Sequence, residues 1–212
     1  TGWNSTMDGG IAWKKDQLYY KNTPANAPAC ILAARLYKQF NGTSDLEWAK
    51  KIYSWMKDHL YEAGTGFVYD GINRENTGAK DNWKFTYNQG TFIGAALELY
   101  NITGEKVYLN DAIKAADYAL NSNVNSNDRI LQSERTGDSG VFKGIFVRYF
   151  TQLILCHELE AGTRTRYVRF MEHNATTLWN EGTYKQSVLF GSYWKTKPSA
   201  ETGLTEQLSG CM

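Results

Sequence analysis

The residues best suited to chemistry lie at, or just before, the starts of predicted helices, and they recur three times. They read Tyr20-Lys21-Asn22, Thr86-Tyr87-Asn88-Gln89-Gly90 and Phe142-Lys143-Gly144. Helix N-termini present unpaired N–H groups and the positive end of the helix dipole. If the three helices line one ring interior, their Asn, Gln, Lys and Tyr side chains form a set of donors and acceptors. Such a set suits sugar hydroxyls better than phosphate or a metal ion, although each Asn could equally serve as a helix cap.

Loop residues add one carboxylate and three large aromatic side chains to this set. Asp70, in Val68-Tyr69-Asp70-Gly71, is the carboxylate that we single out, although Asp-Gly is also a common turn sequence. Trp13, Trp83 and Trp194 lie in long loops. Exposed, they would be platforms on which sugar rings stack, whereas buried they would only anchor the loops.

A pair of catalytic carboxylates is not recognisable in the sequence. Hydrolysis of a glycosidic bond ordinarily needs two carboxylates that flank it. The chain has no two adjacent aspartates, and no spacing establishes that two of its carboxylates converge. We therefore assign no catalytic residue.

The elements that must position these side chains form a repeat of helical hairpins. The apolar residues of one hairpin recur in the next with a constant offset of about 63 residues, which is typical of stacked hairpins that bury their faces on one another. The recurring positions are Ala33, Leu36, Tyr37, Leu46 and Ala49, then Ala96, Leu99, Tyr100, Leu109 and Ala112.

A third, fainter copy is predicted as a helix over 141–160, a turn at 161–163 and a helix over 167–178. Short turns join the two helices within each hairpin, and long loops join successive hairpins. The loops at 3–20 and 63–85 are expected to hold short β-strands around Ile11 and Val68. Long loops gathered at one end of a helical scaffold usually carry function. About three and a half hairpins make either an open solenoid or somewhat more than half of a six-hairpin ring.

Composition excludes several other classes of protein. Apolar residues make up 42% of the 212, so the chain can build a core, and 23 Lys and Arg balance 22 Asp and Glu, which gives no basic face for nucleic acid. No run of 18 apolar residues could span a membrane. The three Cys and three His lack metal-site spacing, and no phosphate-binding loop is present. We predict neither a metal nor a cofactor.

Five motifs, in this order, resemble glycoside hydrolase family 76. They are Gly9-Gly10-Ile11-Ala12-Trp13 with the stretch 20–26, the run 46–55, Asp70-Gly71, the stretch 83–90, and the stretch 142–148. Each motif alone is weak, but together they are specific. The bacterial, Bacteroides-type branch looks closer than the fungal cell-wall transglycosidases of the same clan.

This resemblance implies an all-α (α/α)6 toroid and retaining hydrolysis of α-1,6-mannan, with α-mannan or a mannooligosaccharide as the partner. It places the family's nucleophile and acid/base, two adjacent Asp, upstream of Thr1. It also implies that Asp70 is a hydrogen-bonding residue for the glycone. The residues that we expect to contact the sugar are Trp13, Asn22, Asp70, Tyr87, Asn88, Gln89 and Lys143.

We therefore expect residues 1–212 to be part of an (α/α)6 glycoside hydrolase catalytic domain, truncated at both ends, that covers a bit more than half of the ring. Alone it should not hydrolyse mannan. We expect an extracytoplasmic location: periplasmic, cell-surface or secreted. The main alternative is a catalytically inactive mannan-binding relative. A sugar epimerase on another toroid is disfavoured, because no pair of His lies at the helix starts.

Overall fold

Helical hairpins account for most of the computed structural model, which describes residues 2–212. The chain divides into two compact units. Unit 1 holds residues 2–84 and 88–118, and unit 2 holds residues 85–87 and 119–212. Each unit is described separately below.

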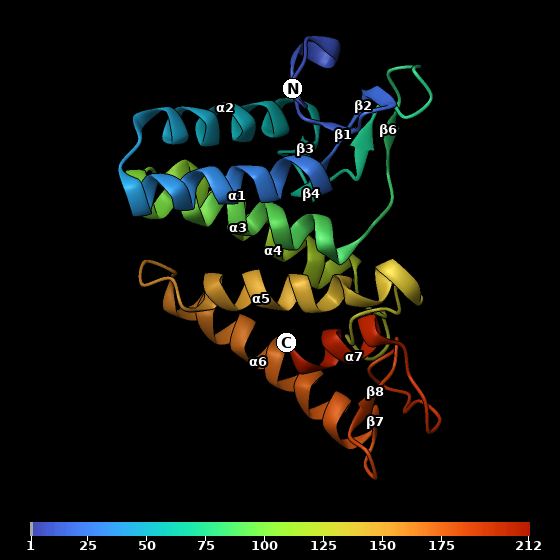
Figure 1. Cartoon of the computed structure of the whole chain (residues 1–212). Helices are drawn as coiled ribbons and strands as arrows, with labels where there is room; N and C mark the ends of the chain where they lie inside the picture. Colours follow the sequence, from blue (N-terminus) through green and yellow to red (C-terminus); the bar gives the residue numbers. More distant parts are fainter. Residues whose placement is uncertain (1) are drawn as a thin grey trace. The chain divides into compact units, whose positions relative to one another are not determined.

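Unit 1 is built on two consecutive hairpins. The first consists of α1 (Thr23–Phe40) and α2 (Thr43–His59), and the second of α3 (Thr86–Thr103) and α4 (Lys106–Ser122), of which α3 begins and α4 ends in unit 2. Helices α1 and α2 lie antiparallel, side by side (Figure 1). The predicted hairpin repeat is therefore confirmed for its first two copies.

The helix boundaries of the first hairpin follow from local capping. The Asn22 side chain accepts a hydrogen bond from the Ala25 N–H at 3.1 Å, and Pro24 occupies the first turn, where a missing N–H is tolerated. Asn41 ends α1 in the left-handed conformation, with φ of 57°. Helix α2 begins at Thr43, directly after Gly42, and has no side-chain cap at its start.

The two hairpins of unit 1 are joined by buried aromatic and polar contacts. The rings of Tyr53 on α2 and Phe92 on α3 stack with centroids 5.3 Å apart. Asp111 on α4 accepts hydrogen bonds from the Tyr53 hydroxyl at 2.9 Å and from the Lys57 ammonium at 2.6 Å. These contacts lock α2, α3 and α4 into one core.

A small antiparallel sheet lies at the end of unit 1 where α1 begins (Figure 1). Its strand order is β1 (Ala12–Lys14), β2 (Gln17–Asn22), β5 (Gly71–Ile72) and β6 (Lys80–Asp81). A separate hairpin pairs β3 (Tyr61–Glu62) with β4 (Phe67–Val68), and a short 3-10 helix, η1, covers Thr6–Asp8. The short strands expected near Ile11 and Val68 are confirmed. Strands β2, β5 and β6 join β1 in a sheet that the sequence did not predict.

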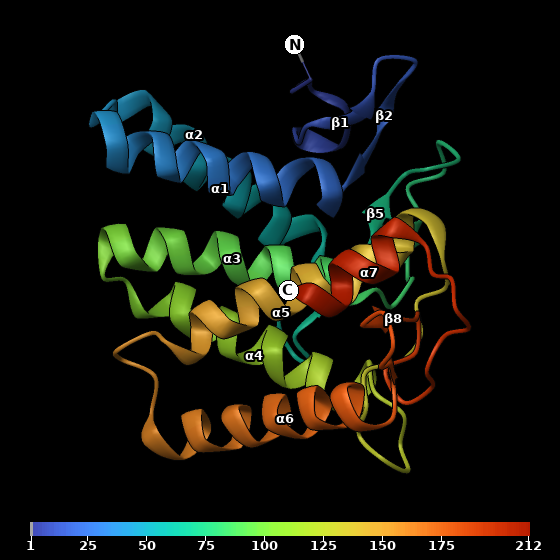
Figure 2. The same cartoon turned by 60° about the horizontal axis from the view of Figure 1, so that its bottom comes forward.

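Unit 2 contains the third hairpin. After the short helix η2 (Gly137–Val141) come α5 (Phe142–Ile154), α6 (Ala161–Asn180), the strand pair β7 (Thr183–Tyr184) and β8 (Leu189–Phe190), and α7 (Leu204–Cys211) (Figure 2). Phe146, Phe150 and Tyr167 form its aromatic core.

The predicted boundaries of this third hairpin are wrong. Helix α5 ends at Ile154 instead of continuing to 160, and α6 starts six residues earlier than the predicted 167. The cause is Glu160, whose carboxylate accepts hydrogen bonds from the N–H groups of Gly162 and Thr163, both at 2.7 Å. This cap starts a new helix where the sequence pattern indicates a turn.

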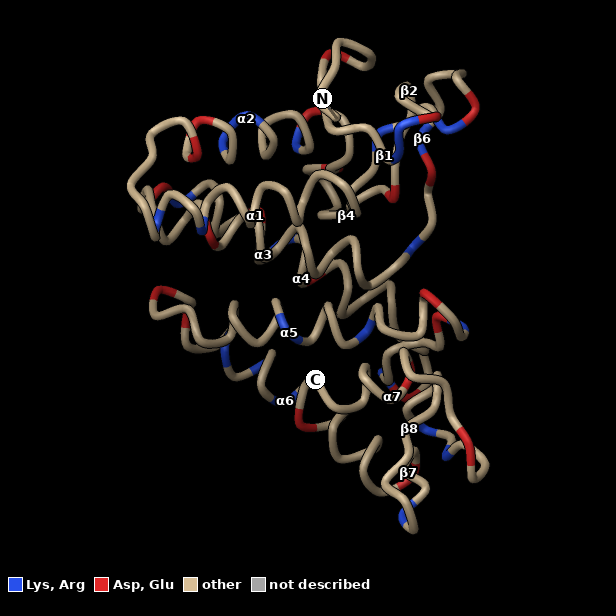
Figure 3. Tube along the Cα trace, in the orientation of Figure 1, with Lys and Arg blue, Asp and Glu red and all other residues tan. Residues whose placement is uncertain are grey.

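Charged residues of both signs are interspersed along each unit (Figure 3). Among residues 2–212, no helix combines the length and apolar character needed to cross a membrane.

Candidate substrate-binding site

The sheet of unit 1 gathers a cluster of polar side chains around Asp70. Residue Asp70 directly precedes β5, which pairs with β2 so that Asn22 lies opposite Gly71, and with β6 so that Gly71 lies opposite Asp81. This register brings together residues that are up to 61 positions apart. We call Tyr20, Asp70, Arg74, Asp81 and Asn88 the Asp70 cluster.

Hydrogen bonds hold the Asp70 cluster together. The Tyr20 hydroxyl lies 3.2 Å from Asp70 Oδ2 and 2.9 Å from Asp81 Oδ2, so its single proton is shared between two carboxylates. Arg74 donates to Asp81 Oδ2 from Nε at 2.8 Å and to Asp70 Oδ2 from its terminal nitrogen at 3.2 Å. The same terminal nitrogen donates to the Tyr20 hydroxyl. One cation thus bridges both carboxylates.

Aromatic rings flank this cation. The Arg74 guanidinium lies 4.2 Å from the ring centroid of Tyr20 and 4.5 Å from that of Trp83. Tyr20 is fully buried, whereas Trp83 is 48% exposed. Trp83 therefore presents an aromatic surface to solvent directly beside the Asp70 cluster, as a stacking platform for a sugar would.

Asn88 completes the cluster from the first turns of α3. Its Nδ2 donates to Asp70 Oδ1 at 3.3 Å, which orients the amide. Its Oδ1 is buried and has no hydrogen-bond partner. Because an unpaired buried acceptor is costly, such an atom is typical of a site that a ligand or water completes.

Burial dominates the electrostatics of the cluster. It raises the pKa of the Asp70 carboxyl above its ordinary value, against the opposing effects of the hydrogen bonds from Asn88 and Tyr20 and of the Arg74 charge. Burial, reinforced by the charges of Asp70 and Asp81, also raises the pKa of Tyr20. Tyr20 is consequently a neutral donor at any physiological pH.

Asn22 lies beside the cluster, because the backbone N–H of Thr23 donates to the Asp70 carbonyl at 2.8 Å. Its own Oδ1 serves as the N-cap of α1, so the helix-cap interpretation is correct for this residue. The prediction that Asn22 contacts a sugar stays a prediction.

Gln89 has a different environment from its neighbour Asn88. Its Oε1 accepts from the Val68 N–H at 2.7 Å, and its Nε2 donates to the carbonyls of Gly66 at 2.9 Å and Ala115 at 3.2 Å. The side chain thereby fastens the β3–β4 hairpin to α3 and α4. This geometry gives Gln89 a supporting role in the structure.

Trp13, Tyr87 and Lys143, the remaining predicted residues, are not members of the Asp70 cluster. Trp13 is on β1, at the edge of the sheet, and is 48% exposed. Tyr87 and Lys143 belong to unit 2, where the ring of Tyr87 packs 5.3 Å from that of Phe142. Trp194, also in unit 2, is buried and therefore anchors its loop.

Lys143 is buried in unit 2. Its ammonium donates to the Ser192 carbonyl at 2.6 Å and lies 5.6 Å from the ring centroid of Trp194. Burial lowers the pKa of Lys143 to about 8, although the charges of Glu134 and Glu206 oppose this effect. Lys143 thus holds the loop after β8, and its predicted contact with a sugar stays a prediction.

Glu134 fixes the start of α3 in unit 2. Its carboxylate accepts from the backbone N–H of Thr86 at 2.6 Å and from the Thr86 hydroxyl. Burial raises the pKa of Glu134 to about 7. The helix start that carries the candidate side chains is therefore capped by a residue 48 positions later in the chain.

Sequence reasoning missed Arg74 and Asp81 and did not select Tyr20 as a site residue. Tyr20 was visible as part of a helix-start motif, but Arg74 and Asp81 lie in the stretch 63–85, which the sequence predicts as a long loop and in which their spacing is not distinctive. The signal that could have found them is the pairing of β2 with β5 and of β5 with β6.

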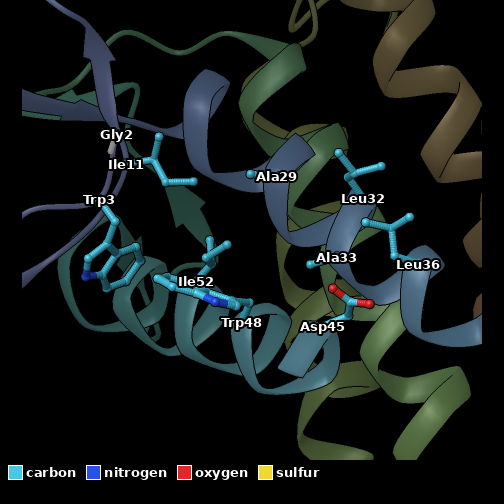
Figure 4. A pocket seen from close by; sticks show the side chains of 10 residues that line it. All are labelled: Gly2, Trp3, Ile11, Ala29, Leu32, Ala33, Leu36, Asp45, Trp48 and Ile52. Carbon is cyan, nitrogen blue, oxygen red and sulfur yellow. The ribbon is translucent and has the colours of Figure 1, made fainter. Parts of the chain in front are cut away.

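An apolar groove in unit 1 is distinct from the Asp70 cluster (Figure 4). It runs between Leu32 and Leu36 on α1 and Trp48 on α2, with Trp3 and Ile11 at one end. Among its lining side chains, only those of Asp45 and the two tryptophans carry a polar atom. Because a sugar needs several donors and acceptors, the Asp70 cluster is the better candidate site.

Within residues 2–212, no three His, Cys, Asp or Glu side chains gather in a way that could hold a metal ion.

Solved structures of similar proteins share the fold of this chain. The α-1,6-mannanase GH76A from Salegentibacter sp. HEL1_6 superposes with a TM-score of 0.93 and 44% identity over 99% of this chain and 62% of that chain. The Lin0763 protein from Listeria innocua is 46% identical, with a TM-score of 0.90, over 99% of this chain and 59% of that chain. The toroid fold class is confirmed, and the chain spans a bit more than half of it.

Among curated relatives, the mannan endo-1,6-alpha-mannosidase DCW1 from Candida glabrata is 35% identical over 114 residues. That match spans 50% of this chain but only 26% of the relative. The higher identities to the bacterial structures support the bacterial branch. A sequence model described as glycosyl hydrolase family 76 matches residues 1–212, from the first residue to the last. The chain belongs to glycosyl hydrolase family 76.

Proposed function

We propose that this chain is part of a retaining enzyme that hydrolyses α-1,6-mannan, and that the Asp70 cluster binds a mannose unit of the substrate. The observation that carries the proposal is the similarity, at 44% identity along nearly the whole chain, to a bacterial α-1,6-mannanase. A variant of that enzyme is described in complex with α-1,6-mannotriose. An extracytoplasmic location is part of the same proposal, because mannan is a polymer too large to enter a cell intact.

The Asp70 cluster supplies the groups that binding of a sugar requires. Asn88 Oδ1 is a buried acceptor that has no hydrogen-bond donor, and the Arg74 guanidinium is a partly exposed donor. Trp83 offers an exposed aromatic ring beside them. Asp70 orients Asn88 and Arg74 and thus acts as a positioning residue. Trp13, on the neighbouring edge strand, would contact a further part of the chain of sugars.

The catalytic pair lies, in our proposal, in a part of the family fold outside these 212 residues. A Salegentibacter variant in which two adjacent aspartates are replaced is described as inactive. The present chain contains no two adjacent aspartates and covers 62% of the Salegentibacter chain. Two adjacent carboxylates supplied from outside residues 1–212 would act as nucleophile and acid/base in a double displacement.

The test measures release of reducing ends from α-1,6-mannan by the full-length protein that contains this chain. Asn88→Ala should weaken catalytic efficiency about tenfold or more, because it removes an acceptor together with the partner of Asp70. Glu75→Gln, in the exposed turn after Arg74, is the matched control and should leave the activity unchanged.

Binding of α-1,6-mannotriose without any release of reducing ends would instead identify the inactive mannan-binding relative. If mannan is neither bound nor cleaved, or if Asn88→Ala behaves like the Glu75 control, the proposed function of the Asp70 cluster is wrong.

A further inference from the structure

The apolar groove of unit 1 is a surface that the proposed function does not use. It has a volume of about 320 Å³ and lies between α1 and α2 (Figure 4). We call it the α1–α2 groove, and six of its lining residues are Ala29, Leu32, Ala33, Leu36, Trp48 and Ile52. Leu32 is 59% exposed and Trp48 43%, and only Ile52 among the six is buried. Large apolar side chains gathered on a surface in this way usually mark an interaction site.

The hairpin repeat shows what a face at this position contacts. Adding the repeat offset to the six positions leads, in α3 and α4, to Phe92, Ala95, Ala96, Leu99, Asp111 and Ala115. All six of these residues are buried, and the most exposed of them, Asp111, is only 7% exposed. The face that is open in the first hairpin is therefore covered in the second.

The first hairpin provides the cover of that second face. The ring of Tyr53 on α2 stacks on Phe92, with centroids 5.3 Å apart. The Tyr53 hydroxyl and the Lys57 ammonium donate to Asp111 at 2.9 and 2.6 Å. The second hairpin thus receives the hairpin before it on this face, and the α1–α2 groove is the equivalent face of the first hairpin.

The outer face of the first hairpin is apolar. The terminal repeat of a stack ordinarily carries a polar outer face, because that face meets solvent. The α1–α2 groove presents Leu32, Leu36 and Trp48 instead. Burial of such side chains against another apolar surface is favourable, so the face is suited to a further packed element.

We propose that the α1–α2 groove receives a further helical hairpin of the full-length protein, from outside residues 1–212, which packs on α1 and α2 as they pack on α3 and α4. Its second helix, the counterpart of α2, would place an apolar or aromatic side chain against Ala29, as Tyr53 lies against Phe92. The Salegentibacter mannanase is long enough to hold such a hairpin, since this chain covers 62% of it. The hairpin is inferred from the repeat and the groove, without reference to a substrate.

A second copy of this chain is a less suitable occupant of the groove. A twofold axis places the same surface of two copies face to face. Because this surface is hollowed between α1 and α2, the two grooves would meet at their rims and leave the space between them unfilled (Figure 4). A helix of the same chain can instead lay a ridge of side chains into the hollow between two helices.

The experiment measures how fast a thiol at position 32 reacts with N-ethylmaleimide in the folded full-length protein, by mass spectrometry of the peptide that contains it. Leu32→Cys carries the probe. Val107→Cys is the matched control, because Val107 lies on α4 in the same unit, is 45% exposed and does not line the groove. We expect the thiol at position 32 to react at least about tenfold more slowly than the control, in a protein that sediments as a monomer.

A second pair of variants tests the same contact through stability. Leu32→Lys should lower the urea midpoint of the full-length protein, because it would bury an ammonium, whereas Val107→Lys should leave the midpoint nearly unchanged. If Leu32→Lys does not fold, the pair of cysteine variants decides. Reaction at position 32 as fast as at position 107, or equal midpoints of the two lysine variants, would overturn the proposal. Protection that is lost on dilution, together with a dimer, would overturn it in favour of a second copy.

These outcomes are separable from those of the mannan assay. Protection of position 32 in a protein that neither binds nor cleaves mannan supports the hairpin and refutes only the proposed function. A reactive thiol at position 32 in a protein that hydrolyses mannan refutes only the hairpin.

Discussion

Replacing Gly71 by alanine should disrupt the Asp70 cluster without touching any of its polar atoms. A Cβ at this position would lie 2.4 Å from the Tyr20 hydroxyl oxygen and 2.6 and 2.7 Å from two of its ring carbons. Those distances are far inside ordinary van der Waals contact. The added methyl group must therefore push Tyr20 away.

Tyr20 has little freedom to move. It is fully buried, its hydroxyl lies between Asp70 and Asp81, and Arg74 covers its ring. Overpacking in a core typically costs ~1–3 kcal/mol. Displacement of the hydroxyl would also weaken its hydrogen bonds to charged groups, each worth ~1.5–3 kcal/mol. Because the structure would relax in part, we expect Gly71→Ala to lower the free energy of unfolding by about 3 kcal/mol.

The assay is urea unfolding of the full-length protein, with mannotriose binding measured on the folded variant. Gly64→Ala is the control, because no atom lies within 4 Å of a Cβ at Gly64 and the same unit contains both glycines. Tyr20→Phe removes only the hydroxyl, so Gly71→Ala should remain costly in that background, whereas a leucine at position 20 should relieve much of the cost. A loss below 1 kcal/mol, or an equal loss with leucine at position 20, would refute the clash with Tyr20 as the cause.

Two further predictions concern buried polar groups. The pKa of Glu134 in the folded protein, about 7, exceeds its ordinary value of 4.5, so the folded state binds this proton more tightly than the unfolded state. Stability from this group is therefore full below pH 4.5 and is lost as the pH rises to about 7, by on the order of 3 kcal/mol. Glu134→Gln should flatten this part of the stability-versus-pH curve, measured by urea unfolding, and a parallel curve would contradict the assignment. Tyr53→Phe keeps the stack on Phe92 but removes the 2.9 Å bond to Asp111, and it should lower the free energy of unfolding by about 1–2 kcal/mol in the same assay. A cost near zero would show that Lys57 alone satisfies that carboxylate.

The helices could be predicted from sequence because they depend on local information. The buried residues of α1 include Ala27, Cys30, Ile31 and Ala34, which is the spacing of a single helical face. The cap at Asn22 and the left-handed Asn41 are likewise encoded within a few positions of the helix ends. The third hairpin was misread, because a Glu that caps two N–H groups is not distinguishable by spacing from a Glu on a helix surface.

The candidate site could be predicted only in part, since most of its contacts are between residues far apart in sequence. Asp70 and Asn88 were found because each belongs to a recognisable motif, and the structure joins them directly. Arg74 and Asp81 were not predicted, because the two strands that bring them to the site, β5 and β6, have only two residues each. Strands this short show almost no alternation of apolar and polar residues in the sequence. A helix-start position also cannot tell a ligand-binding amide from a structural one. Asn88 and Gln89 are adjacent, yet the first has an unpaired oxygen and the second is bound on both ends.

That contrast between neighbours indicates how this fold separates stability from binding. Consecutive residues on a helix point about 100° apart, so at the start of α3 the Asn88 amide faces Asp70 while the Gln89 amide faces the β3–β4 hairpin. Gln89 fastens the scaffold with three backbone contacts. Asn88 is oriented by a single carboxylate that is itself fixed by Tyr20 and Arg74. Replacement of Gln89 should therefore lower the free energy of unfolding, while the fraction of protein that stays folded should still bind the sugar. Replacement of Asn88 should appear chiefly as lost binding, with a stability cost limited to its one hydrogen bond to Asp70, because its Oδ1 atom stabilises nothing in the free protein.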